Sequence, residues 1–159
     1  TLVGHMSLYK NTLHHSNNTF PNWLLELLGT YTSYINKCEY CYEHHFAGMK
    51  RFLNNDEKAA ILRHHIEHNS LSKYLSEKEY ALIDYAQKLT LEADTLSKAA
   101  INSLKNLGYD DGEILEVNQV VAYFNYANRT VMGLGVNTNG EILGLSPNNK
   151  NNESTWEHQ

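Results

Sequence analysis

The sequence predicts an all-α protein, and three observations support this fold class. The chain of 159 residues contains only two prolines, Pro21 and Pro147. Between them, helix-start and helix-stop signals replace the alternation of apolar and polar residues that marks strands. Apolar residues recur at helical spacing, and the longest such stretch starts at Asp110 or Asp111 and stops at Gly133. We therefore expect a bundle of helices.

The first two helices are expected on either side of a break at Asn36. Residues 23–29 form an apolar run that suits a buried helix, with Asn22 as its N-cap. Residues 30–35 are rich in β-branched and aromatic side chains, so they fit either a helix or a strand. A second helix follows over about residues 38–53.

Three further helices are expected before the long one. The third begins at about Asp56. The fourth opens at Ser76, because Ser76 and Glu79 have the S-x-x-E spacing of a capping box. The fifth covers about residues 97–107, and Gly108 is placed to end it.

The length predicts one domain over residues 1–159, since this is close to the usual size of a single hydrophobic core. No internal repeat is evident. Residues 137–159 form a polar, asparagine-rich C-terminal tail. Its candidate anchors are apolar residues: Ile142, Leu143, Leu145 and Trp156.

Composition and charge argue against two classes of binding partner, nucleic acids and membranes. The formal net charge of −5 gives no general attraction to nucleic acid or to anionic lipid. No apolar run approaches the roughly 20 residues of a membrane helix, and the first ten residues lack a signal-peptide pattern. We expect a cytoplasmic protein with neither a nucleic-acid nor a membrane partner.

The two cysteines, Cys38 and Cys41, form a C-x-x-C pair followed by His44 and His45. At about 100° per helical residue, Cys38, Cys41 and His45 share one face. Residues three apart on a helix have Cα atoms about 5 Å apart, which suits a disulfide. A helix N-terminus and a nearby imidazolium both stabilise a thiolate. The spacing therefore favours redox chemistry.

Other uses of a cysteine pair fit less well. Zinc needs a fourth ligand, and c-type haem needs histidine directly after the second cysteine, where this chain has Tyr42. A thioredoxin-like site would need a βαβ context. We expect no metal and no cofactor. A pair of inert buried cysteines remains an open alternative.

Several blocks together resemble a known family. Residues 36–45 resemble the N-x-C-x-Y-C-x-x-x-H core of the AhpD-like, carboxymuconolactone decarboxylase superfamily, in its peroxidase-related branch. A glutamate is expected twelve residues before the first cysteine, and Glu26 stands there. The blocks DGEILE, VVAYFNYANR, GLGV and EILGLSP continue the resemblance, which spans about residues 21–147.

The resemblance implies an AhpD-like helical bundle that assembles as a homo-oligomer (dimer, trimer or hexamer) and reduces hydroperoxides. It implies that Cys41 attacks the peroxide and that Cys38 resolves the sulfenic acid as a disulfide. His45 and Glu26 would relay protons, and an external dithiol would reduce the disulfide. AhpD itself has histidine where this chain has Tyr40, which has a reference pKa near 10 and cannot act as a base at neutral pH.

Three other functions remain open at this point. They are a thiol-disulfide oxidoreductase, a non-redox decarboxylase or lactone-binding relative, and a stress-related protein without turnover. His44 lies about 100° from His45 on a helix, so we expect it to face elsewhere.

Two further groups of residues have no assigned role. His64 and His68 have the i, i+4 spacing of a metal pair, but a solvated helical face is the expected reading. Asn125, Asn128 and Arg129 line either the pocket or an interface.

Overall fold

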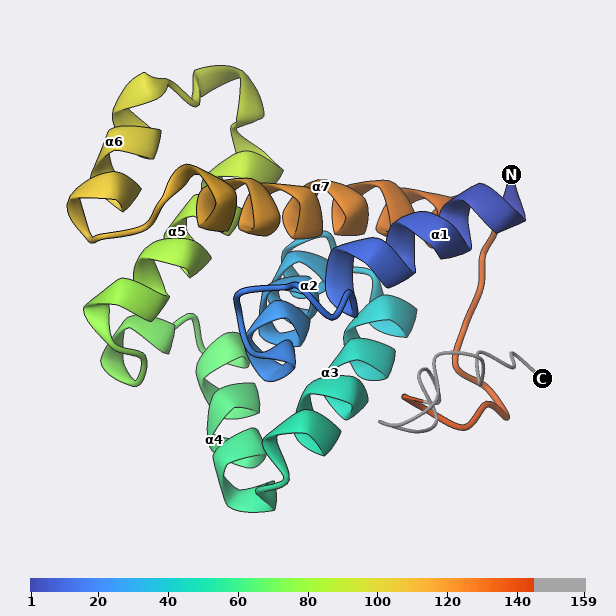
Figure 1. The fold of residues 1–159 in the computed structure, drawn as a ribbon. Coiled ribbons are helices and arrows are strands. Elements are labelled where there is room, and N and C mark those ends of the chain that lie inside the picture. Colours follow the sequence, from blue (N-terminus) through green and yellow to red (C-terminus); the bar gives the residue numbers. More distant parts are fainter. Residues whose placement is uncertain (145–159) are drawn as a thin grey trace.

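A computed structural model describes residues 1–144 of the chain, and these residues form helices joined by short links, with no strand among them (Figure 1). The all-α prediction is confirmed. The elements in chain order are α1 (Leu2–Leu13), α2 (Asn22–Ile35), α3 (Glu39–Leu53), α4 (Asp56–Glu67), η1 (Leu71–Lys73), α5 (Glu77–Leu91), η2 (Ala93–Thr95), α6 (Lys98–Asn106) and α7 (Asp111–Gly133).

Helix α2 is the central element and packs against α3, α5 and α7 (Figure 1). Every residue from 24 to 33 is buried, as expected for a helix with apolar residues on all sides. The ambiguous residues 30–35 are helical, because burial on all sides outweighs their preference for strands. The helix begins one residue earlier than expected, since Pro21 and not Asn22 is the cap residue.

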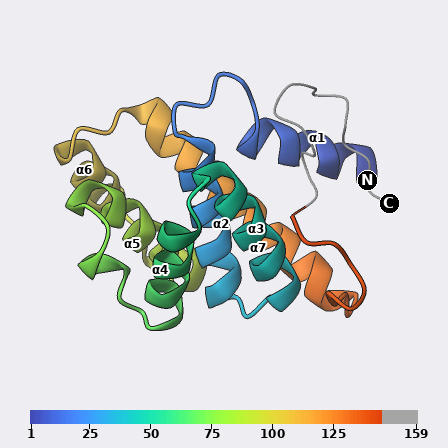
Figure 2. The same cartoon turned by 90° about the horizontal axis from the view of Figure 1, so that it is seen from below.

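Helix α1 was not predicted from the sequence. It lies along the C-terminal half of α7 (Figures 1 and 2). Its apolar pattern is weak because only Tyr9, Thr12 and Leu13 are buried, whereas Leu2 and Val3 are exposed. Its C-terminal end carries two polar side chains that contact each other, Tyr9 and His14.

The link between α2 and α3 places the first cysteine. Lys37 adopts a left-handed conformation, with φ of 60°. The amide of Lys37 donates to the carbonyl of Tyr34, and the amide of Cys38 donates to that of Ser33, each at 3.0 Å. This is the Schellman arrangement that ends a helix. Cys38 is also the N-cap of α3, so the C-x-x-C pair lies where one helix stops and the next starts.

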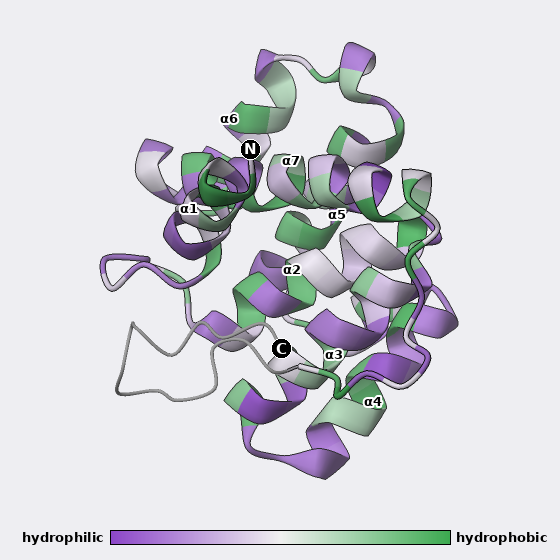
Figure 3. Ribbon diagram, turned by 90° about the vertical axis from the view of Figure 1, so that its right-hand side faces the viewer, coloured by the Kyte–Doolittle hydropathy of each residue, from purple (hydrophilic) through white to green (hydrophobic). Residues whose placement is uncertain are grey.

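The remaining helix starts follow the expected chemistry. Ser76 and Glu79 form a capping box at α5, and Asp110 and Glu113 form one at α7. Gly108 follows α6 with φ of 86°. Hydrophobic residues recur along α2, while the link between α3 and α4 is hydrophilic (Figure 3).

Residues 136–144 run back from the end of α7 to the side of α3 (Figure 1). Arg51 of α3 donates a hydrogen bond to the carbonyl of Gly144. Of the expected apolar anchors, Ile142 and Leu143 are exposed, and Leu145 and Trp156 lie outside the described residues. Polar contacts therefore hold this part of the tail. Within residues 1–144, the helices are too short or too polar to cross a membrane.

Candidate active site at the cysteine pair

The two cysteines meet at the start of α3. Both are free thiols and both are buried, with 1% of Cys38 and 5% of Cys41 exposed. Their sulfur atoms lie 2.6 Å apart in a thiol-thiol contact. The helical spacing therefore does what the sequence predicted, because it brings the two sulfurs into contact across one turn.

A cavity of about 610 Å³ opens beside the second cysteine. Cys41 belongs to its lining and Cys38 does not, so Cys41 is the sulfur that a small molecule in the cavity can reach. The polar residues of the lining are His5, Tyr9, Glu26, Tyr40, His44, His45, Tyr123 and Glu141. The apolar part comes from α1, α7 and the tail: Met6, Ala127, Val131 and Ile142.

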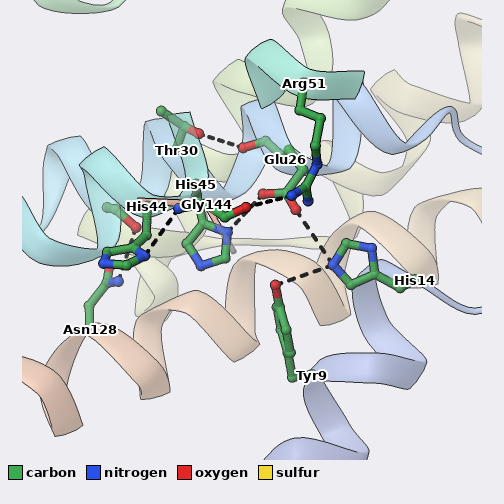
Figure 4. A network of polar contacts seen from close by, with 10 residues as sticks. Tyr9, His14, Glu26, Thr30, His44, His45, Arg51, Asn128 and Gly144 are labelled. Carbon is green, nitrogen blue, oxygen red and sulfur yellow. Dashed lines mark hydrogen bonds and ion pairs between the residues drawn. The ribbon is translucent and has the colours of Figure 1, made fainter. Parts of the chain in front are cut away.

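Glu26 and His45 form a close pair at the same cavity (Figure 4). The Nδ1 atom of His45 on α3 lies 2.7 Å from Oε2 of Glu26 on α2. Only 1% of the Glu26 side chain is exposed, against 18% for His45. A buried carboxylate is costly without partners, so this contact explains how a glutamate is tolerated inside an apolar helix.

Gly48 makes room for the carboxylate of Glu26. A Cβ atom at this position would lie 3.2 Å from the carboxyl carbon and from both oxygens. Because residue 48 has no side chain, helix α3 approaches Glu26 without crowding its carboxylate. Glycine inside a helix otherwise costs about 1 kcal/mol relative to alanine.

A second histidine reaches Glu26 from the other side (Figure 4). The Nε2 atom of His14, at the end of α1, lies 3.5 Å from Oε1 of Glu26 and 3.2 Å from the hydroxyl of Tyr9. Burial lowers the pKa of His14 to about 4. His14 is therefore neutral at physiological pH, and it lies beside Glu26 as an uncharged polar group rather than as a cation. Sequence reasoning missed both His14 and Tyr9, along with α1.

The contact between the sulfurs makes one thiol easier to ionise than the other. The hydrogen bond from Cys41 lowers the pKa of Cys38 to about 7, against the opposing effect of burial. The same contact, together with burial, raises the pKa of Cys41. The pKa order favours a thiolate on Cys38, while the cavity gives access to Cys41. Because the two sulfurs are in contact, a proton can pass from Cys41 to the Cys38 thiolate and leave the negative charge on the accessible sulfur.

His44 does not face away from the site, so that expectation was wrong. Its ring packs against the Tyr40 ring with centroids 4.3 Å apart, and its Nε2 atom lies 3.3 Å from Oε2 of Glu141. Burial, with a hydrogen bond to Glu141, raises the pKa of Tyr40 to about 12. The tail approaches α3, and this is why a residue 100° from His45 still lines the cavity.

The asparagine block of α7 lies behind the cysteines. Asn128 is completely buried; its Oδ1 atom accepts a hydrogen bond from Asn36 and its amide donates one to Ser33. Asn125 is bonded to Asn36, while Arg129 is exposed and donates to Asn125. Asn128 is thus the fully buried member of this block, and Arg129 is its exposed member.

Among residues 1–144, the structure shows no third ligand for the His64 and His68 pair. Their rings stack with centroids 4.1 Å apart, and Nδ1 of His68 donates to the His64 carbonyl. Across the described part of the chain, no group of three or more histidine, cysteine or acidic side chains is arranged to hold a metal ion.

Comparison with known proteins identifies the fold. No protein-family model and no curated protein matches the chain. A peroxidase-related protein from Silicibacter sp. TM1040 aligns with a TM-score of 0.75 at 21% identity, over 86% of this chain and 69% of its own. An AhpD-core, peroxidase-related protein from Ralstonia eutropha JMP134 gives 0.73 at 18% identity, over 82% and 66%.

A third structure, a protein of unknown function from Agrobacterium tumefaciens whose description names the antioxidant defence protein AhpD, has a TM-score of 0.67 at 19% identity. It aligns over 86% of this chain and 88% of its own. The chain spans about two thirds of the length of the first two structures. The resemblance that the sequence predicted is confirmed at the level of the fold, which is the fold of AhpD-like, peroxidase-related proteins.

Proposed function

We propose that this protein is a thiol-dependent peroxidase that reduces hydroperoxides through the Cys38 and Cys41 pair. One observation carries the proposal. A dithiol with its sulfurs 2.6 Å apart opens, through Cys41, onto the same cavity as a hydrogen-bonded glutamate and histidine. Such a site combines a nucleophile, a resolving thiol and a proton relay.

In the first step, the Cys41 thiolate attacks the terminal oxygen of the hydroperoxide. A sulfur–oxygen bond forms, the oxygen–oxygen bond breaks, and the alcohol leaves with a proton from the His45 and Glu26 pair. Cys41 becomes a sulfenic acid. Glu26 binds Nδ1 of His45, which leaves Nε2 to exchange the proton with the cavity.

In the second step, the Cys38 thiolate attacks the sulfur of the sulfenic acid. A disulfide forms and the hydroxyl leaves as water after it takes up a proton. The two electrons that reduced the peroxide came from the two thiols. An external dithiol restores them by exchange, and this reductant is a partner of the proposed cycle.

The burial of both sulfurs favours a hydroperoxide over a bulky disulfide as the oxidant. With 1% and 5% exposure, the cysteines meet a small molecule through the cavity more readily than a disulfide on a protein surface. A thiol-disulfide oxidoreductase is therefore the second choice. The decarboxylase and the non-catalytic alternatives make no use of the dithiol.

The proposal is tested by mixing the reduced protein with a slight excess of cumene hydroperoxide and counting free thiols over time. We expect the loss of two thiols per chain. Cys41→Ser should abolish the fast phase, whereas Cys38→Ser should stop at a sulfenic acid that dimedone traps. Wild-type thiols that are lost no faster than those of Cys41→Ser would refute the proposal. Faster oxidation by a disulfide than by the hydroperoxide would favour the oxidoreductase.

The role of His45 is tested separately with His45→Ala. General acid catalysis contributes about 10²- to 10⁴-fold, so thiol oxidation should slow by at least tenfold while the helical circular dichroism stays unchanged. His64→Ala, at an exposed histidine on α4, is the matched control and should react like the wild type. Equal rates for the two variants would remove His45 from the mechanism.

A further inference from the structure

We propose that Phe124 is a positioning residue for His45. Its ring, which lies in the space that Gly29 leaves open on α2, fixes the plane of the imidazole and so directs Nε2 into the cavity. The importance of this contact for catalysis rests on the proposed peroxidase function. The restraint on the His45 ring does not, and the two are measured apart.

A single hydrogen bond leaves the His45 ring partly free. Its Nδ1 atom lies 2.7 Å from Oε2 of Glu26, so this contact fixes one ring nitrogen. The ring can still turn about the line that joins the two atoms, because the χ2 torsion of histidine has broad wells. A proton relay needs Nε2 in a defined position, since catalysis tolerates little displacement of the reacting groups. The ring therefore requires a second contact.

The ring of Phe124 supplies this second contact. Its centroid lies 4.4 Å from that of His45, and the two ring planes meet at 87°. An edge-to-face contact of this kind favours one relative orientation, and the distance is at the short end of the range of about 4.5–7 Å for aromatic pairs. Phe124 is completely buried, whereas 18% of the His45 side chain is exposed. The phenyl ring is thus the fixed member of the pair.

Two tyrosines complete a closed cluster of four rings. Phe124 also packs edge to face against Tyr123, with centroids 5.4 Å apart. Tyr123 stacks with Tyr9 at 5.7 Å, and Tyr9 meets His45 edge to face at 6.0 Å. Each ring contacts two others, and α1, α3 and α7 all contribute to the cluster. A turn of the His45 ring would therefore disturb its contacts with both neighbours.

Gly29 on α2 determines where the Phe124 ring can lie. A Cβ atom at residue 29 would come within 2.2 Å of Cε2 and Cζ of that ring, a distance that real Cβ atoms do not show. The ring thus occupies the space in which any other residue would place its side chain. Gly29 follows Glu26 by three residues, so the two are neighbours on the surface of α2. Helix α2 therefore presents both the carboxylate that binds Nδ1 and the space for the ring that sets the imidazole plane.

The experiment measures the mobility of the His45 ring in the reduced protein, without peroxide. Carbon-13 relaxation of its Cδ2–H and Cε1–H bonds gives an order parameter, and the spectrum of His45→Ala identifies its signals among the nine histidines. We expect a rigid ring in the wild type, with an order parameter of about 0.85, and a value below about 0.6 in Phe124→Leu. The matched control is Phe20→Leu, at a buried phenylalanine that contacts Tyr109 instead, and it should leave the ring rigid.

Gly29→Ala tests the same restraint from α2. The new methyl group displaces the Phe124 ring, so His45 should become as mobile as in Phe124→Leu. In the double variant the ring that clashes is gone, and the mobility should equal that of Phe124→Leu alone, which is the non-additivity expected of residues in contact. Gly133→Ala, where an added Cβ meets nothing within 4 Å, should behave like the wild type. If Gly29→Ala does not fold, Phe124→Leu decides alone.

Kinetics then test the catalytic part in a Cys38→Ser background, where Cys41 is the remaining cysteine. Attack on a hydroperoxide releases an alkoxide that must take up a proton, whereas attack on iodoacetamide releases iodide, which needs none. Phe124→Leu should therefore slow the oxidation of Cys41 by cumene hydroperoxide about tenfold, within the range for general acid catalysis, and leave its alkylation unchanged. A general loosening of the site would alter both rates.

The possible outcomes separate the positioning role from the peroxidase. An order parameter that is the same in Phe124→Leu as in the wild type would overturn the proposal, whatever the rates. A mobile ring with an unchanged ratio of oxidation to alkylation, in a protein that does reduce hydroperoxide, would overturn it as well. A mobile ring in a protein that never reacts with hydroperoxide would uphold the restraint by Phe124 and refute the peroxidase.

Discussion

At the scale of single residues, the absence of a side chain at Gly48 should be as important as the presence of Glu26. In Gly48→Ala, the new Cβ would lie 3.2 Å from the carboxylate and push it from His45. Small misplacements of catalytic groups are costly, and we expect thiol oxidation to slow by roughly tenfold. The measurement is the rate of thiol loss with cumene hydroperoxide.

The control for this change is Gly133→Ala at the end of α7, where an added Cβ meets nothing within 4 Å. Both changes add one methyl group to a helix. Only Gly48→Ala should alter the rate of thiol oxidation. If Gly48→Ala oxidises as fast as Gly133→Ala, the close approach of α3 to Glu26 has no bearing on reactivity.

His14 should make the stability of the protein depend on pH. Its folded-state pKa of about 4 lies below the unfolded value of 6.5, so the unfolded chain binds the proton first as the pH falls. The free energy of unfolding is therefore unaffected by this group above pH 6.5. It falls progressively toward pH 4 as the unfolded chain takes up the proton, by roughly 3 kcal/mol in all.

Urea unfolding at several pH values between 4.5 and 7.5 measures this contribution. His14→Gln keeps a polar side chain beside Glu26 but does not titrate, so its free energy of unfolding should fall less steeply with decreasing pH than that of the wild type. If the free energy of unfolding depends on pH in the same way for both proteins, the prediction is contradicted.

At the scale of elements, the sharp turn between α2 and α3 requires a strained backbone conformation at Lys37. Lys37 has φ of 60°, which costs an ordinary residue about 1–2 kcal/mol. Glycine avoids this cost but gains entropy when unfolded, so Lys37→Gly should stabilise the protein by about 0.5–1 kcal/mol. Asn54→Gly, at the left-handed end of α3, should gain less because asparagine tolerates this conformation. Chemical denaturation of both variants measures whether Lys37→Gly gains more stability than Asn54→Gly.

Helix boundaries could be predicted wherever local chemistry sets them, and α1 shows the limit. The capping box at Ser76 and the break at Asn36 were both readable in the sequence. Helix α1 was not, because its apolar residues are split between buried Tyr9 and exposed Leu2 and Val3. Its position depends on α7, a partner distant in the chain.

The residues of the candidate site also differ in how far the sequence predicts them. Helical spacing predicted the contact of Cys38 with Cys41, while Glu26 was found only through the family resemblance. His14 and the packing of His44 under the tail depend on contacts between elements, and no local pattern reports them. Gly48 did leave a signal, because a glycine inside a helix often marks a close approach.

At the scale of the whole molecule, the tail should control access to the cavity. Gly144 lies against α3, where an added Cβ would be 2.7 Å from the Cβ of Ala47. Gly144→Ala should therefore displace residues 140–144 and raise the rate of Cys41 alkylation by iodoacetamide several-fold. Gly135→Ala has the same kind of backbone strain, at φ of 66°, without a clash. Equal alkylation rates would show that the tail does not limit access.

The homo-oligomer stays a prediction of the sequence resemblance. Exposed apolar residues on α1 and α7 give it a candidate surface: Leu2, Val3, Leu8, Tyr126 and Met132. Sedimentation velocity over a range of protein concentrations tests it directly, and a monomer at all concentrations would exclude it.

Glu26 lies between two histidines that differ in their access to the cavity. His45 faces the cavity, whereas His14 is sealed in the interior and stays neutral unless the solution is strongly acidic. In the proposed peroxidase cycle, His45 would therefore carry the proton between Glu26 and the cavity. His14 would keep to the neutral form throughout, so it would hold Glu26 in place without taking up the proton.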